Sequence, residues 1–119
     1  MLSVLVVDDR TDFRQAFASL LDGQPDLEVV AQAGSLAEAS HMLEGVDVAI
    51  LDRGLPDGDG LKLMRPLREA NPDARVFVMS ATAEMRHPGD AMEAGADGVI
   101  DKLGPFEWAF SAIRDDGGG

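Results

Sequence analysis

The chain has 119 residues, which suits one domain with a single sizeable core. Its 22 acidic residues against ten basic ones give a formal charge of −12, which argues against a domain that binds nucleic acid or an anionic membrane by itself. The chain has no cysteine for disulfides or thiolate metal sites, and no apolar run long enough to be a signal or membrane-spanning segment, so we expect a cytoplasmic protein.

Apolar runs that predict strands alternate with segments of helical spacing. In chain order the pattern predicts a strand at 3–7, a helix at 13–21, an edge strand at 27–31, a helix at 35–43, a strand at 46–52, a helix at 61–68, a strand at 75–80, a weaker helix from about 88 to 94, a strand at 98–102 and a last helix from 105. Asp9 or Thr11 is the candidate N-cap of the first helix, and Ser35 with Glu38 forms a capping box for the second.

This alternation predicts an α/β fold with a five-stranded parallel sheet that carries helices on both faces. We expect one domain over residues 1–114, followed by a flexible tail or the start of a linker over 115–119, where three glycines follow two aspartates.

The predicted strands end in polar residues that carry chemistry. The first strand ends at Asp8-Asp9, the third at Asp52, the fourth at Ser80 and the fifth at Lys102. Because the carboxyl ends of parallel strands share one edge of the sheet, we expect these side chains to lie in one crevice.

Three neighbouring carboxylates repel one another, and a divalent cation relieves that repulsion. Oxygen ligands without histidine or cysteine favour Mg²⁺ or Mn²⁺, and Mg²⁺ typically takes one or two carboxylates together with a phosphate oxygen. Lys102 and Ser80 would bind further phosphate oxygens. The pattern therefore predicts a phosphoryl site with Asp52 as candidate nucleophile.

Four motifs in this order resemble the receiver domain of bacterial response regulators. They are Asp8-Asp9, Asp52 with Leu55-Pro56 and Gly60, Ser80-Ala81, and Gly95-Ala96-Asp97-Gly98 leading to Lys102. The resemblance implies a flavodoxin-like fold, in which the five strands have the order 2-1-3-4-5. The resemblance extends from Leu2 to Ile113. Arg14, Pro105 and Glu107 are most similar to receivers that precede a helix-turn-helix output domain.

The resemblance implies a role for each matching residue. Asp52 would accept a phosphoryl group from a phosphohistidine of a sensor kinase. Asp9, Asp52 and the backbone carbonyl of Gly54 would bind Mg²⁺ directly, and Asp8 would act mostly through a water on the metal. Ser80 and Lys102 would bind the phosphoryl oxygens.

The function implied is a phosphorylation-dependent switch in a two-component phosphorelay that regulates transcription. The chain would catalyse its own phosphorylation and dephosphorylation but turn over no external metabolite. Its expected partners are a sensor histidine kinase, a DNA-binding output domain and a second copy of the chain on phosphorylation.

Four residues depart from the family pattern. Val99 replaces the aromatic residue that usually couples to Ser80, and Leu103 follows Lys102 where many relatives have proline. Arg10 and Arg53 flank the acidic residues in sequence. We hypothesise that one of these guanidinium groups offsets the carboxylates and weakens the Mg²⁺ requirement, against the alternative that both are solvated surface charges.

Two other functions are compatible with part of this pattern. A phosphatase of the haloacid dehalogenase type also uses an aspartate and Mg²⁺, but it needs an acid two residues after the nucleophile, where Asp8 is followed by Arg10 and Asp52 by Gly54. A pseudo-receiver that binds proteins without being phosphorylated would account for Val99, Arg10 and Arg53.

Overall fold

The computed structural model describes the backbone of residues 1–80 and 92–118 and the side chains of these segments through residue 114. In this part of the chain a parallel sheet has five strands: β1 (Leu2–Val7), β2 (Leu27–Ala33), β3 (Val48–Asp52), β6 (Arg75–Ser80) and β7 (Gly98–Asp101). The spatial order is β2-β1-β3-β6-β7, which confirms the predicted order and places β2 at an edge.

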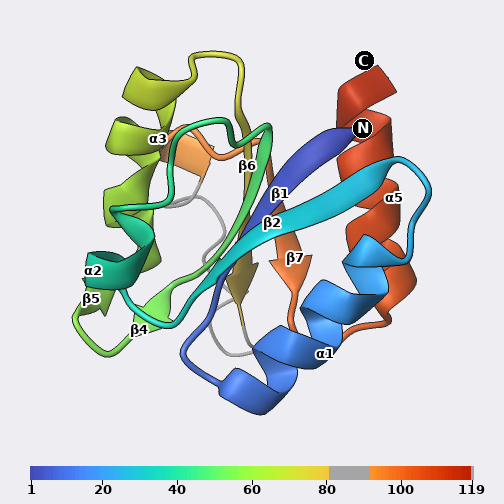
Figure 1. The fold of residues 1–119 in the computed structure, drawn as a ribbon, viewed down its shortest axis with the longest axis horizontal. Coiled ribbons are helices and arrows are strands. Elements are labelled where there is room, and N and C mark those ends of the chain that lie inside the picture. Colours follow the sequence, from blue (N-terminus) through green and yellow to red (C-terminus); the bar gives the residue numbers. More distant parts are fainter. Residues whose placement is uncertain (81–91, 119) are drawn as a thin grey trace.

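Helices cover both faces of the sheet (Figure 1). They are α1 (Thr11–Asp22), α2 (Leu36–Ala39), the 3-10 helix η1 (Gly60–Leu63), α3 (Met64–Ala70) and α5 (Phe106–Gly118). Figure 1 shows α1 and α5 on one side of the sheet and α2 and α3 on the other. A short antiparallel hairpin of β4 (Gly54–Leu55) and β5 (Gly58–Asp59) follows β3.

The strands are apolar on both faces because each face packs against helices. Val4, Val6, Val48 and Ile50 pack with Phe17, Leu21 and Ile113 from α1 and α5. Leu5, Val7, Ala49 and Leu51 pack with Ala39, Leu63 and Leu67 on the opposite face. Alternate residues of a strand point to opposite faces, so a run such as residues 48–51 can supply both cores at once.

Helix ends differ in part from their predicted positions. The capping box is present, since Ser35 Oγ accepts a hydrogen bond from the Glu38 N–H at 3.1 Å, but α2 ends at Ala39 instead of continuing through residue 43. Neither Asp9 nor Thr11 is the N-cap of α1. Arg10 occupies that position, without a side-chain cap, so the cap prediction was wrong.

The last helix is longer than expected, because the backbone remains helical to Gly118 and so includes residues 115–118 of the expected tail. The domain boundary at residue 114 stays a prediction. The helix predicted from about Pro88 lies almost wholly outside the described residues. Within the described parts of the chain, every helix is too short or too polar to cross a bilayer.

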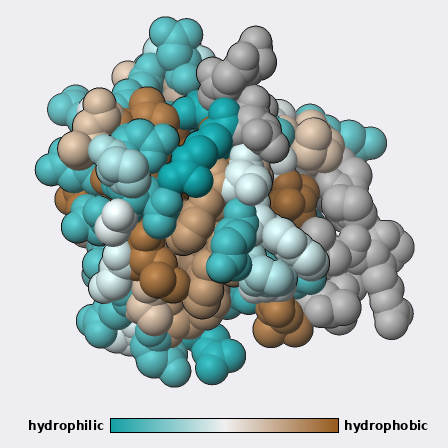
Figure 2. Space-filling view, turned by 90° about the vertical axis from the view of Figure 1, so that its right-hand side faces the viewer, coloured by the Kyte–Doolittle hydropathy of each residue, from teal (hydrophilic) through white to brown (hydrophobic). Residues whose placement is uncertain are grey.

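The side of the molecule that carries α1 and α5 faces the viewer in Figure 2, where hydrophilic residues surround smaller apolar areas. Trp108 on α5 is 57% exposed. Leu20 on α1 is also exposed.

Candidate functional site

The carboxyl ends of the strands lie at one edge of the sheet, the lower edge in Figure 1. The register pairs Val7 of β1 with Leu51 of β3, so Asp8 and Asp52, the next residue in each strand direction, are neighbours. Asp52 is the last residue of β3 and Ser80 the last of β6, while Lys102 follows β7 directly. The predicted convergence of strand ends is therefore present.

Three carboxylates gather at this edge. Asp8, Asp9 and Asp52 each offer an oxygen, and these oxygens all lie within 4.8 Å of one another. Asp8 and Asp52 are buried, whereas Asp9 is exposed. The arrangement combines two desolvated acids with one that faces solvent.

The Lys102 ammonium contacts two of these acids. Its Nζ lies 2.7 Å from Asp8 Oδ2 and 3.1 Å from Asp52 Oδ2. The contact with Asp8 is an ion pair and not a well-aligned hydrogen bond, because Oδ2 of this buried carboxylate has no hydrogen-bond partner within the described structure. The Nζ atom also lies 4.9 Å from the centre of the Phe13 ring, a cation–π distance.

Burial and charge shift the pKa values of this ion pair. Burial is the largest influence on Asp8 and raises its pKa, while the contact with Lys102 and the Arg10 N–H act in the opposite direction. Burial alone would lower the pKa of Lys102, but the contacts with Asp8 and Asp52 outweigh it, so the net shift is upward. The site thus resists ionisation of Asp8 and holds Lys102 protonated.

Backbone and side-chain hydrogen bonds fix the loops that carry the acids. The Arg10 N–H donates to Asp8 Oδ1 at 2.8 Å, and Arg14 Nη1 donates to the Asp8 carbonyl at 2.9 Å. The Gly54 N–H donates to Asp52 Oδ1 at 3.2 Å. The side chains of Asp8 and Asp52 are therefore each held by the backbone N–H of the turn that follows their own strand.

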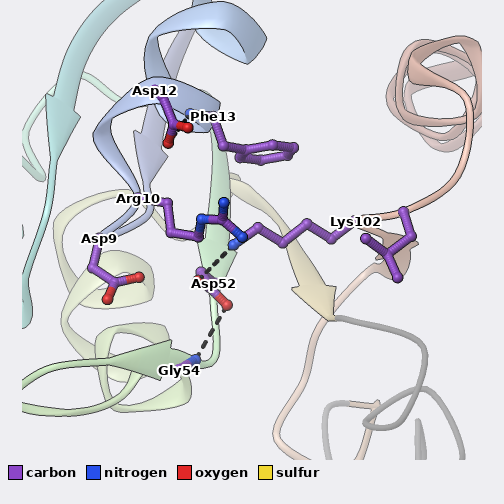
Figure 3. Close-up of a pocket in the computed structure, with 8 residues that line it drawn as sticks. Asp9, Arg10, Asp12, Phe13, Asp52, Gly54 and Lys102 are labelled. Carbon is purple, nitrogen blue, oxygen red and sulfur yellow. Dashed lines mark hydrogen bonds and ion pairs between the residues drawn. The ribbon is translucent and has the colours of Figure 1, made fainter.

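A pocket of about 540 Å³ opens beside Asp52 (Figure 3). Its lining consists of Asp9, Arg10, Asp12, Phe13, Asp52, Gly54, Lys102 and Leu103. Sequence reasoning assigned no site role to Asp12 or Phe13. Phe13 lies four residues after Asp9, which is about one helical turn past the acidic pair. That spacing was the one indication in the sequence that the Phe13 ring reaches the site.

Ser80 is placed differently from the other predicted residues. It is 3% exposed, and its backbone carbonyl accepts a hydrogen bond from the Lys102 N–H at 2.9 Å. Neither Ser80 nor Asp8 is among the described residues that line the pocket. The backbone link nevertheless ties the end of β6 to the residue that carries the ammonium.

The two arginines near the acids have different surroundings. Arg53 Nη2 forms an ion pair with Asp59 at 2.9 Å, across the β4–β5 hairpin. Arg10 lines the pocket, and Figure 3 shows its side chain directed toward the centre of the pocket, where the Lys102 and Asp52 side chains also point. Of the two candidates, Arg10 is the one whose guanidinium faces the acidic site.

Comparison with known proteins identifies related chains. The family model for the response regulator receiver domain matches residues 4–113. The DNA-binding transcriptional activator DevR/DosR of Mycobacterium tuberculosis is 38% identical over 122 aligned residues, which cover 100% of this chain and 56% of the relative. The chain spans about half the length of the curated relatives it matches.

Solved structures agree with this comparison. The receiver domain of the putative response regulator NarL from M. tuberculosis has a TM-score of 0.85 at 28% identity, over 99% of this chain and 97% of that one. A response regulator from Burkholderia pseudomallei has a TM-score of 0.78 at 26% identity, over 95% of this chain and 66% of that one. The structure of that second protein contains a phosphorylated aspartic acid, a calcium ion and citrate.

Proposed function

The chain belongs to the response regulator receiver family, and on that premise we propose that it is a phosphoacceptor switch with Asp52 as the residue that accepts the phosphoryl group. The observation that carries this proposal is the position of Asp52, which lines a pocket and whose carboxylate lies beside Asp8, Asp9 and the Lys102 ammonium. The phosphorylated aspartic acid in the related B. pseudomallei protein supports it.

The donor set fits a hard divalent cation. Three carboxylate oxygens lie close together without histidine or cysteine, and Asp8 Oδ2 is buried without an aligned hydrogen bond. We infer that Asp9, Asp52 and the carbonyl of Gly54 hold Mg²⁺ and that Asp8 acts through a water. The cation would neutralise the charge that builds up on the phosphoryl oxygens.

The residues of this chain carry the rest of the reaction. An Asp52 carboxylate oxygen attacks phosphorus, and the bond between phosphorus and the donor's nitrogen breaks, so that the electron pair leaves with the imidazole. Lys102 moves from the carboxylates to a phosphoryl oxygen, and Ser80 donates a hydrogen bond to another. Such a transfer depends on positioning and charge neutralisation, which this pocket supplies.

The relatives support a proposal about the wider role. We propose that a sensor histidine kinase phosphorylates the chain in the cytoplasm, and that the signal passes to a DNA-binding output domain or to a second copy of the chain. The name of DevR/DosR, a DNA-binding transcriptional activator, supports an output in transcription. No external metabolite would be turned over.

The decisive experiment is incubation with acetyl phosphate and Mg²⁺ followed by intact mass spectrometry. Wild type should gain the mass of one phosphoryl group, and Asp52→Asn should gain none. A chain that stays unmodified with donor and metal both in excess would contradict the proposal.

A pseudo-receiver is the second candidate, and Val99 is the observation that favours it. This side chain packs against the core on β7, where an aromatic residue would be expected to couple the site to the surface. Under this alternative Asp52→Asn would leave partner binding unchanged, whereas under the main proposal it would abolish the response to acetyl phosphate.

A further inference from the structure

The pocket beside Asp52 contains a second cationic side chain, Arg10, which the reaction described above does not use. Figure 3 shows the Arg10 side chain turned toward the centre of the pocket and not away from it. The backbone of Arg10 is held by two hydrogen bonds. The Arg10 N–H donates to Asp8 Oδ1, and the Arg10 carbonyl accepts the first hydrogen bond of α1 from the Arg14 N–H, both at 2.8 Å.

Lys102 and Arg10 differ in what they contact. Lys102 lies against the carboxylates of Asp8 and Asp52. The guanidinium of Arg10 forms no ion pair with any residue that the structure describes. Lys102 thus neutralises acids of the site, while the Arg10 side chain is directed into the pocket without a carboxylate partner among the described residues.

The shape of the pocket suits an anion opposite this guanidinium. Gly54 carries no side chain into the pocket, and among the described residues a Cβ placed there would meet only Asp52 Oδ1, at 4.0 Å. Leu103 contributes an apolar wall. The planar fork of a guanidinium matches two oxygens of a phosphoryl group, which makes arginine the preferred residue for bidentate phosphate binding.

We propose that Arg10 is a phosphoryl-binding residue of this site, which contacts the oxygens of the incoming donor and of the acyl phosphate on Asp52. This inference rests on the proposed function. Arg10 takes no part in breaking or forming bonds: Asp52 oxygen bonds to phosphorus, the leaving group departs with its electron pair, and the guanidinium stabilises negative charge throughout.

Removing the charge of Arg10 should have opposite effects on the binding of Mg²⁺ and of a phosphoryl group. A guanidinium near the carboxylates repels Mg²⁺, so Arg10→Ala should tighten Mg²⁺ binding. The same substitution removes a cation from the phosphoryl group, so it should weaken the binding of beryllofluoride, a stable phosphoryl mimic. We expect each effect to be about three- to tenfold, the size of one partly solvated charge interaction.

The test compares Arg10→Ala and Arg10→Lys with wild type and with Arg65→Ala. Arg65 on α3 is a matched control, since its side chain is 91% exposed and the charge change is the same. Mg²⁺ affinity is measured by calorimetry, beryllofluoride affinity by ¹⁹F NMR at saturating Mg²⁺, and phosphorylation by acetyl phosphate through intact mass. Because Arg10 makes no side-chain cap, we expect Arg10→Ala to fold, which its melting temperature checks.

The proposal predicts tighter Mg²⁺, weaker beryllofluoride and slower phosphorylation in Arg10→Ala, partial recovery in Arg10→Lys and no change in Arg65→Ala. Equal affinities in Arg10→Ala and wild type would overturn it while leaving the function of Asp52 intact. A second result would also overturn it: wild type that is phosphorylated without Mg²⁺ while Arg10→Ala is not. Arg10 would then replace the metal. A wild type that takes neither beryllofluoride nor a phosphoryl group would overturn the proposed function as well.

Discussion

The Lys102 ammonium lies 2.7 Å from Oδ2 of Asp8, a carboxylate that is completely buried. The contact supplies a counter-ion inside the fold, at the position where the three acids would otherwise repel one another. Both members of the pair have raised pKa values, for different reasons, and two predictions follow from them separately.

The first prediction concerns alkaline pH. The raised pKa of Lys102 means that its contribution to stability is fully present below the unfolded value of 10.5 and is lost as the pH rises through the folded value. We expect metal-free wild type to lose stability in that window and Lys102→Met to lose less. Denaturant unfolding across the alkaline range measures the difference.

The composition of the chain limits the number of side chains that could contribute to an alkaline loss of stability. The chain has neither tyrosine nor cysteine, and Lys62 is its one other lysine. Lys62→Met is the matched control, and it should keep the alkaline loss of wild type. Curves of Lys102→Met and wild type that run parallel would contradict the assignment.

The second prediction concerns the buried acid. Burial raises the pKa of Asp8, so its ionised form costs stability above the folded pKa, and that cost is relieved as the pH falls toward the ordinary value of 3.8. Without metal, Asp8→Asn should melt above wild type at neutral pH. The gap should close under acid conditions, and the variant should bind Mg²⁺ more weakly.

Thermal unfolding followed by circular dichroism at several pH values tests this. Asp9→Asn is the comparison, because Asp9 belongs to the same acidic group but is exposed. A metal-free Asp8→Asn that melts below wild type at neutral pH would show that the contact with Lys102 outweighs the cost of burial.

The third prediction compares two glycines in the turn after Asp52. A Cβ on Gly60 would overlap the backbone carbonyl of Asp52, whereas a Cβ on Gly54 has room. Gly60→Ala must displace the strand end that carries the acceptor, which should cost about 1–3 kcal/mol and slow phosphorylation. Gly54→Ala should change stability by less than about 0.5 kcal/mol.

Urea unfolding gives the two stabilities, and the rate of phosphorylation by acetyl phosphate gives the functional effect. Equal stability and equal phosphorylation rates in Gly60→Ala and Gly54→Ala would contradict the prediction. The contact between position 60 and the Asp52 carbonyl would then not be what requires glycine.

The fourth prediction concerns the hairpin after β3. Asp57 accepts hydrogen bonds from the N–H groups of Leu36 at 2.8 Å and Ala37 at 3.0 Å, at the start of α2. These bonds lower the pKa of Asp57, so the stabilisation is present above 3.8 and disappears as the pH falls through the folded value. Asp57→Ala should speed hydrogen exchange at both amides several-fold at neutral pH.

Asp73→Ala is the control, because Asp73 is an exposed acid at a different turn. It should leave exchange at Leu36 and Ala37 unchanged. Exchange that is equally slow in Asp57→Ala would mean that the Ser35 cap holds the start of α2 alone.

The sheet was predictable because its strands are apolar on both faces. Residues 48–51 are buried without exception, and such a run between turns fits a strand covered by helices on both sides. The parallel direction of the strands followed from the alternation of strands and helices, and the convergence of Asp8, Asp52 and Lys102 followed from that direction. The strand order was expected from the resemblance to receiver domains.

Helix ends were less predictable, because tertiary contacts override local preference. Residues 40–43 have apolar spacing that suits a helix, yet α2 ends at Ala39 and its first turn is held by Asp57 from a distant hairpin. Arg10 is a poor N-cap by residue type, but the turn that fixes Asp8 places it there. Neither constraint is visible in the local sequence.

The acids could be identified from their positions at strand ends, but the partners of the arginines could not. Arg10 and Arg53 are equivalent in sequence, since each follows a strand-end aspartate. The β4–β5 hairpin brings Asp59 to Arg53, whereas Arg10 has no ion-pair partner in the part of the chain that the structure describes. That hairpin depends on pairing between residues 54–55 and 58–59, which the periodicity of the strands does not encode.

The acidic pocket is assembled from positions far apart along the chain: Lys102 meets Asp52 across 50 residues, and β1 must lie beside β3 before Asp8 can join them. No fragment that lacks one of these strands contains the complete constellation. Under the proposed function, a chain in which β1, β3 and the end of β7 have not yet come together would lack the complete phosphoryl-accepting site.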